Sequence, residues 1–139
     1  MTKKIAVFSS GRGGNFNNLC EYFASAKNIS IDLLVTNNLG SMSKKIAEKN
    51  NINSVYADAS VLQSGHLDSV MKRKNIDLVV LAGFLLKIPK KLVSKYEKKI
   101  INLHPSLLPR FGGKGMYGDN VHKAVLRSGE NVTGITIHY

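Results

Sequence analysis

Two polar side chains in the last third of the chain have the types and the spacing that chemistry requires. Asn102 and His104 lie two residues apart in the segment I-I-N-L-H-P, residues 100–105. The segment begins as an apolar run typical of a buried strand, and a spacing of two places both side chains on one face of a strand. An amide donates hydrogen bonds, and an imidazole exchanges protons near neutral pH. The pair therefore predicts a site where a hydrogen-bond donor and a proton-transfer group meet.

The residue that follows the pair fixes where this site lies in a sheet. Pro105 has no backbone N–H and restricts the residue before it, so it ends the strand pattern. In sheets of parallel strands, ligands bind beyond the carboxyl ends of the strands. We therefore expect Asn102 and His104 at a ligand-binding edge.

The elements that must position the pair alternate along the chain. Residues 76–82 read I-D-L-V-V-L-A, a nearly continuous apolar run that predicts a central parallel strand buried on both faces. The other expected strands are 5–9, 31–36, 52–56, a strand that begins at residue 100, and 133–139. Helices are expected after a cap at Asn15, over 43–50, over 60–74, after Pro89, and over 121–129. Such alternation predicts a doubly wound α/β domain with a mostly parallel sheet.

Composition limits the classes of function. A chain of 139 residues with 43% apolar residues suits one domain with a real core. The net charge of +11 suggests nucleic acid, but the lysines are spread over many segments without interleaved aromatic residues, so we expect solvated surface and no nucleic-acid partner. No apolar run approaches the ~20 residues of a membrane helix, and no leader pattern is present, so we expect a cytoplasmic protein. Cys20, the single cysteine, is predicted to lie in the core.

The segment S-S-G-R-G-G-N, residues 9–15, lies between the first strand and the first helix. A helix N-terminus offers free N–H groups and partial positive charge, so the segment predicts an anion site, although a tight turn that binds nothing explains the same residues. Phe16 replaces the third glycine of a dinucleotide fingerprint, and the second strand ends at Thr36 without an acidic residue. A single phosphate is therefore favoured over a dinucleotide, which argues against an oxidoreductase.

Three motifs together carry a family resemblance. The motif N-x-H-P-S-L-L-P at 102–109, L-A-G-F at 81–84 and S-G-R-G-G-N at 10–15 resemble the folate-dependent formyltransferases, and within them the phosphoribosylglycinamide formyltransferase (glycinamide ribonucleotide transformylase) family. The resemblance implies a three-layer, Rossmann-like fold with residues 1–139 as a single domain. It also implies formyl transfer from 10-formyltetrahydrofolate to the amine of 5'-phosphoribosylglycinamide in purine biosynthesis, without a metal. Because the family continues beyond Tyr139, we expect a C-terminally truncated chain that lacks the family's catalytic aspartate, and its own activity is an open question.

The resemblance also assigns binding residues. It implies Gly13, Gly14 and Asn15 as ligands of the substrate phosphate, with Arg12 as a further contact. It implies folate contacts for Leu85, Leu86, Lys87, Ile88 and Asn102. Many members carry a basic residue where Leu86 stands, which leaves side-chain contacts open but retains backbone ones. Without the resemblance, Leu85 and Ile88 would be interpreted as core.

The resemblance gives the Asn102–His104 pair a specific task. When an amine attacks a formyl carbon, an oxyanion develops, and donors aimed at that oxygen stabilise it. We expect the Asn102 amide and a protonated His104 to donate to it, and His104 then to protonate the leaving nitrogen. His138 matches a histidine that the family keeps near the site; a supporting role and a solvent-facing sheet position are both open. His66 and His122 are interpreted as solvated helix residues.

Two other functions remain open. The first is a methionyl-tRNA formyltransferase, a family that shares a version of S-L-L-P; the positive charge of the chain would suit a tRNA partner. The glycine loop and the H-P-S form argue against it. A folate- or nucleotide-binding module without turnover is the second. A homodimer is also left open.

Overall fold

One sheet of six strands organises the fold. The computed structural model describes residues 1–139, and its strand order is β3-β2-β1-β4-β5-β6. The strands are β1 (Lys3–Phe8), β2 (Ile29–Thr36), β3 (Asn53–Tyr56), β4 (Leu78–Leu81), β5 (Ile100–His104) and β6 (Thr136–His138). The first five run parallel, and β6 pairs antiparallel with β5 at the edge. The mostly parallel sheet predicted from the sequence is therefore confirmed.

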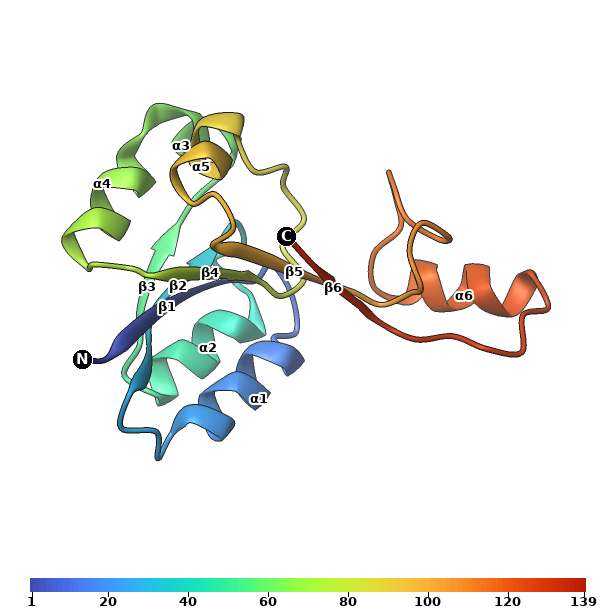
Figure 1. The fold of residues 1–139 in the computed structure, drawn as a ribbon, viewed down its shortest axis with the longest axis horizontal. Coiled ribbons are helices and arrows are strands. Elements are labelled where there is room, and N and C mark those ends of the chain that lie inside the picture. Colours follow the sequence, from blue (N-terminus) through green and yellow to red (C-terminus); the bar gives the residue numbers. More distant parts are fainter.

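Helices cover both faces of this sheet. In Figure 1, α1 (Gly14–Phe23) and α2 (Met42–Lys49) lie on one face, while α3 (Ala59–Ser64), α4 (His66–Arg73) and α5 (Lys90–Lys95) lie on the other. The arrangement is a doubly wound, three-layer α/β fold, as predicted. The layers explain why β1 is apolar on both sides: Ile5 and Val7 pack against α1, whereas Ala6 and Phe8 pack against α4.

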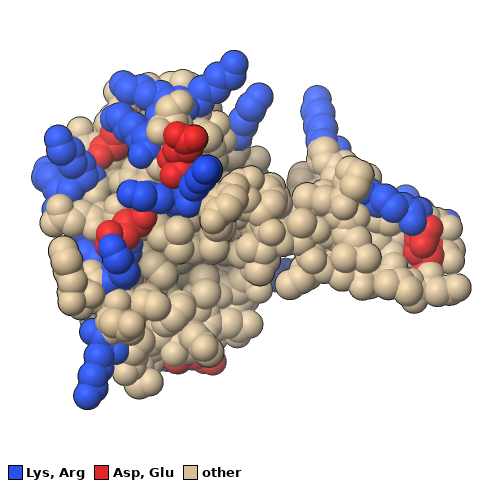
Figure 2. Space-filling view, viewed as in Figure 1, with Lys and Arg blue, Asp and Glu red and all other residues tan.

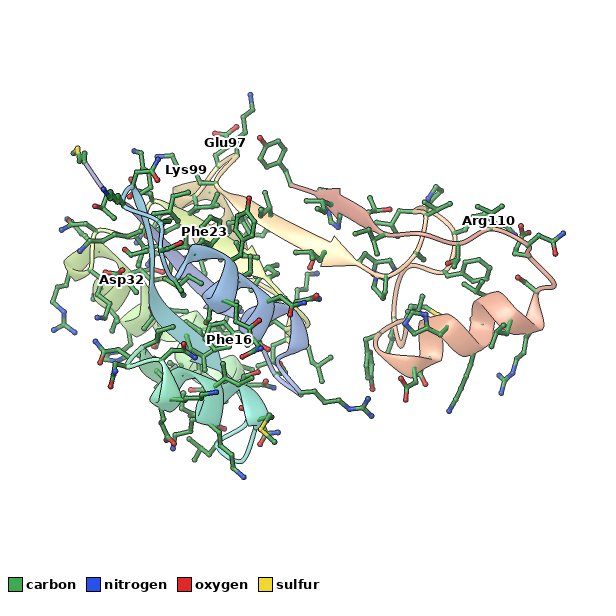
Figure 3. The ribbon with its side chains drawn as sticks, turned by 90° about the horizontal axis from the view of Figure 1, so that it is seen from below. Phe16, Phe23, Asp32, Glu97, Lys99 and Arg110 are labelled. Carbon is green, nitrogen blue, oxygen red and sulfur yellow. The ribbon has the colours of Figure 1, made fainter.

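Helix α1 shows how the apolar stripe becomes a buried face. Phe16 and Cys20 are buried against the sheet, and Phe23 packs at the margin of the same cluster, as its position on α1 in Figure 3 illustrates. Burial raises the pKa of the Cys20 thiol and favours its neutral form. The prediction that Cys20 is a core residue is confirmed.

The segment predicted as one helix over 60–74 is two helices. The chain turns at Gly65, whose φ of 81° lies in the left-handed region, so α3 ends and α4 begins there. Asp58 caps α3 by accepting a hydrogen bond from the Val61 N–H at 2.9 Å. The predicted core residues Leu62, Leu67, Val70 and Met71 are all buried despite the break.

A lobe formed by residues 105–135 projects beyond the edge of the sheet. It contains α6 (Asp119–Arg127) and joins the rest of the chain through β5 and β6 (Figure 1). The last strand is shorter than predicted, because only Thr136–His138 pair with β5 and residues 133–135 belong to the lobe. The lobe thus connects directly to both strands that carry candidate site residues.

Positive side chains are scattered rather than gathered. Figure 2 shows lysine and arginine over the body and on the lobe, with aspartate and glutamate side chains among them. This distribution agrees with the interpretation of most lysines as solvated surface. None of the helices combines the length and apolarity that a membrane span requires.

Candidate functional site

The carboxyl end of β5 opens into a cavity, which we call the central cavity. Asn102 and His104 both line it, together with Leu103 between them. The cavity has a volume of about 370 Å³. Its other walls come from the first turn of α1, the loop after β4, and the lobe; they include Asn15, residues 83–85, Met116, Tyr117, Gly118 and His122. His122 is solvent-exposed, as predicted, and yet lines this wall.

His104 is held by a backbone carbonyl. Its Nε2 lies 2.9 Å from the carbonyl oxygen of Phe111. Because a carbonyl only accepts, Nε2 is the protonated nitrogen and donates. The Nδ1 atom has no hydrogen-bond partner in the chain, and Phe111 does not line the central cavity. Nδ1 is therefore the ring nitrogen available to a ligand.

Asn102 is held by the neighbouring strand. It lies opposite His138 in the β5–β6 pair, and its Nδ2 is 3.0 Å from His138 Nε2. His138 Nδ1 lies 2.8 Å from the Tyr139 carbonyl oxygen, so Nδ1 carries the proton and Nε2 accepts from the Asn102 amide. One amide hydrogen of Asn102 remains free for another acceptor. Of the two readings of His138 from the sequence, this contact with Asn102 favours the supporting one.

The glycine loop between β1 and α1 begins the helix differently from the prediction. The N-cap is Gly13, at φ 72° and ψ 22°, and Asn15 lies in the first turn, so the predicted cap at Asn15 was wrong. The left-handed turn that glycine adopts readily is the reason. The N–H groups of Gly14, Asn15 and Phe16 have no acceptor in the chain. They form the open donor set that an anion requires.

Buried serines fix this loop, and sequence reasoning missed them. Ser43 on α2 lies 2.7 Å from Ser9, Oγ to Oγ, and donates to the Gly11 carbonyl at 3.1 Å. Ser10 Oγ accepts from the Leu85 N–H at 2.9 Å, which ties the loop to the segment after β4. A serine in a helix that begins thirty residues later carries no local signal of this role.

A second hollow, the glycine-loop cavity, lies beside the central cavity. It has a volume of about 380 Å³ and is lined by residues 9–12, Ala82, Gly83, Leu85 and residues 117–120. Arg12 borders it with a side chain that is 91% exposed, and its Nη2 lies 3.9 Å from Asp119 Oδ2 on the lobe. Gly13 and Gly14 line neither cavity, whereas Asn15 lines the central one. The predicted phosphate ligands are therefore adjacent but do not share one surface.

A third, apolar cavity lies on the other side of Asn102. It measures about 550 Å³ and is lined by residues of α5, the loop before it, β5 and β6; they include Leu86, Ile88, Val93, Tyr96, Asn102, His138 and Tyr139. Leu85 instead borders the central and glycine-loop cavities, and Lys87 lines none of the three. The four residues assigned to folate are thus divided among different surfaces.

The three cavities follow one another. The glycine-loop and central cavities share Gly83, Leu85, Tyr117 and Gly118, and the central and apolar cavities share Phe84 and Asn102. Asn102 therefore lies where the central cavity meets the apolar one, and the central cavity continues into the glycine-loop cavity.

Comparison with known proteins finds relatives along nearly the whole chain. The profile of the family described as "Formyl transferase" matches residues 3–139. The chain is 42% identical to "Phosphoribosylglycinamide formyltransferase, chloroplastic" of Arabidopsis thaliana, over 99% of the chain and 49% of that protein. The Vigna unguiculata protein of the same name is 41% identical, over 99% of the chain and 46% of that protein. The chain spans about half the length of these curated relatives.

Solved structures give the same result. The phosphoribosylglycinamide formyltransferase of Anaplasma phagocytophilum is 33% identical, with a TM-score of 0.88 over 100% of this chain and 65% of that one. The match covers the sheet, both helical layers and the lobe. On the profile, the identities and the fold together, the chain belongs to the formyl transferase family.

Proposed function

We propose that the protein transfers a formyl group from 10-formyltetrahydrofolate to the amine of 5'-phosphoribosylglycinamide, a step of purine biosynthesis. The observation that carries the proposal is the position of Asn102 and His104 at one cavity, between an anion-binding loop and an apolar hollow. The names of the plant relatives support the same substrate.

The phosphate of the ribonucleotide binds at the start of α1. The free N–H groups of Gly14 and Asn15 and the helix dipole favour an anion there. Arg12 adds an exposed positive charge at the rim, where its only ion-pair partner is Asp119 at 3.9 Å. Gly13 serves this site by shaping the turn rather than by contact. From this end, the substrate amine reaches the central cavity.

The folate binds from the opposite side. Its flat ring system enters the apolar cavity, where Leu86 and Ile88 supply apolar contacts and backbone groups of the same segment can bond to ring nitrogens. Asn102 borders both cavities, so the formyl group lies next to its amide. Leu85 and Lys87 then contribute at the edge of the folate site, through backbone groups.

The chemistry is a direct acyl transfer. The amine nitrogen bonds to the formyl carbon, the carbonyl oxygen gains negative charge, and the bond from carbon to the folate nitrogen then breaks. The free amide hydrogen of Asn102 stabilises the oxygen, and one such donor contributes about 3–4 kcal/mol. His104 donates through Nδ1, which requires the imidazolium form because Nε2–H is engaged by Phe111. His104 delivers the Nδ1 proton to the leaving folate nitrogen and, now neutral, takes up at the same atom the proton that the amine nitrogen loses, so it returns to the imidazolium form.

A formylation assay tests the proposal with Asn102→Ala and His104→Ala. Each change removes a donor to the developing oxyanion, so kcat falls roughly 10²–10³-fold while substrate binding, measured by calorimetry, persists. His66→Ala, an exposed histidine at the start of α4, is the matched control and keeps full turnover. Retained turnover in either site variant contradicts the proposal. Loss of fold in both, seen by circular dichroism, assigns the residues a structural role instead.

The partners that follow are small anionic molecules rather than a membrane or a nucleic acid. The scattered lysines form no continuous basic groove on the face in Figure 2. The compartment we propose is the cytoplasm, as the sequence suggests; the two plant relatives are chloroplastic by name. The homodimer stays a prediction.

A further inference from the structure

Phe111 has a backbone conformation that its side chain disfavours. Its φ is +55°, in the left-handed region that bulky residues rarely adopt. Gly112 follows immediately, yet the left-handed turn falls on the phenylalanine. Such outliers persist only when their surroundings fix them, and they gather at functional sites.

The turn has one clear consequence for the site. It directs the Phe111 carbonyl back toward the end of β5, where its oxygen lies 2.9 Å from His104 Nε2. The six-residue loop between them, residues 105–110, closes on itself through this contact. A residue with an extended conformation at position 111 would point its carbonyl elsewhere and release the imidazole.

Several contacts fix the turn. Ser106 Oγ donates to the Arg110 carbonyl at 2.7 Å, and the Arg110 guanidinium lies over the Phe111 ring at 5.3 Å from its centre. Glu130, in the connection between α6 and β6, forms an ion pair with Arg110 at 2.5 Å. Figure 3 labels Arg110 on the lobe, away from the helices of the body. Contacts within the lobe therefore stabilise the turn at Phe111, whose carbonyl accepts the hydrogen bond from His104.

We propose that Phe111 is a positioning residue whose strained backbone fixes His104 as the Nε2–H form and leaves only Nδ1 for a ligand. The contact defines which nitrogen exchanges protons in the central cavity. The assignment of the proton to Nε2 depends only on the contact with the Phe111 carbonyl. Its effect on turnover rests on the proposed function. A neutral His104 accepts through Nδ1, and a charged one donates through it, so a single atom serves both steps.

Nuclear magnetic resonance of the full chain, labelled with ¹⁵N and ¹³C, tests the contact directly. We expect a slowly exchanging Nε2–H signal for His104 with a scalar coupling across the hydrogen bond to the Phe111 carbonyl carbon. A free histidine side chain also prefers the Nε2–H tautomer, although it populates the other one as well. The tautomer alone therefore does not test the contact, whereas the coupling and the slow exchange do. An uncoupled, rapidly exchanging His104 overturns the inference.

Two substitutions separate the backbone from the ring. Phe111→Gly removes the ring but adopts positive φ readily, so the exchange rate of Nε2–H stays within about twofold. Phe111→Val disfavours positive φ, so exchange accelerates about tenfold, the factor that corresponds to one lost hydrogen bond. Equal rates in the two variants overturn the inference. If Phe111→Val does not fold, Phe111→Ala takes its place and must exchange faster than Phe111→Gly.

Turnover distinguishes this inference from the proposed function. In a formylation assay, Phe111→Val lowers kcat and leaves KM for both substrates unchanged, whereas Phe111→Gly retains kcat. If the exchange rates differ as expected but kcat does not, the role of His104 in turnover is wrong and the positioning stands. If the exchange rates do not differ, the positioning itself is wrong, whatever the turnover.

Discussion

Gly13 and Gly14 look interchangeable in the sequence, and the structure separates them. A Cβ added to Gly13 would lie 2.7 Å from Ser43 Oγ, 3.0 Å from Ile46 Cδ1 and 3.1 Å from the Ser43 Cα atom. The backbone contact cannot be relieved by rotating a side chain, so α2 would have to move. A Cβ added to Gly14 would meet no atom within 4 Å. The two alanine variants therefore form a matched pair.

We expect Gly13→Ala to destabilise the fold by about 2–5 kcal/mol, because a left-handed alanine costs about 1–2 and overpacking adds about 1–3. Gly14→Ala should be neutral or slightly stabilising, since alanine favours a helix over glycine. Urea unfolding followed by far-UV circular dichroism measures both free energies. Equal free energies of unfolding for the two variants would refute the reasoning, because both keep the same N–H groups.

The remaining predictions concern a side-chain acceptor and a carboxylate. His138→Leu removes the acceptor of the Asn102 amide, so kcat in a formylation assay should fall about tenfold at unchanged KM. His138→Gln restores an acceptor oxygen and should recover most of the rate. Equal rates for the two variants would contradict a positioning role for His138. The Lys4 N–H, 2.9 Å from Asp77, and the Lys3 ammonium, 3.3 Å away, hold the pKa of the Asp77 carboxyl below its usual value. A lowered folded-state pKa adds stability above the unfolded pKa of about 3.9, and this stability is lost as pH falls through the folded pKa. Asp77→Asn should thus lower the urea midpoint at pH 7, and the difference from the parent should vanish as pH falls below the folded-state pKa of Asp77; a pH-independent gap would argue against the linkage.

The fold, and the position of Asn102 and His104 beside one cavity, could be predicted because their signals are local. The apolar run of β4 and the spacing of Asn102 and His104 depend only on strand periodicity. The break at Gly65 could have been predicted as well, because a glycine inside a helical pattern weakens the helix. The apolar stripe that continues on both sides of Gly65 favoured a single helix instead.

The parts that could not be predicted depend on contacts between distant segments. Ser43 fixes the glycine loop from another helix, and Ser43 and Ile46 of α2 leave no space for a side chain at Gly13. The contact of Phe111 with His104 depends on a backbone dihedral, to which no residue pattern points. The Asn102–His138 bond depends on how β5 and β6 pair across the 31 residues of the lobe.

The alignment of β6 with β5 therefore determines which side chain lies opposite Asn102. Thr136 Oγ1 donates to the Ser106 carbonyl at 2.7 Å and accepts from the Leu108 N–H at 3.0 Å, which locks β6 beside β5 in one alignment. Sliding β6 by one residue would bring the hydrocarbon of Ile137 opposite Asn102 and turn the imidazole to the other surface. The Thr136 hydroxyl, which bonds only to the backbone of Ser106 and Leu108, thus fixes that His138 and not a neighbour faces Asn102.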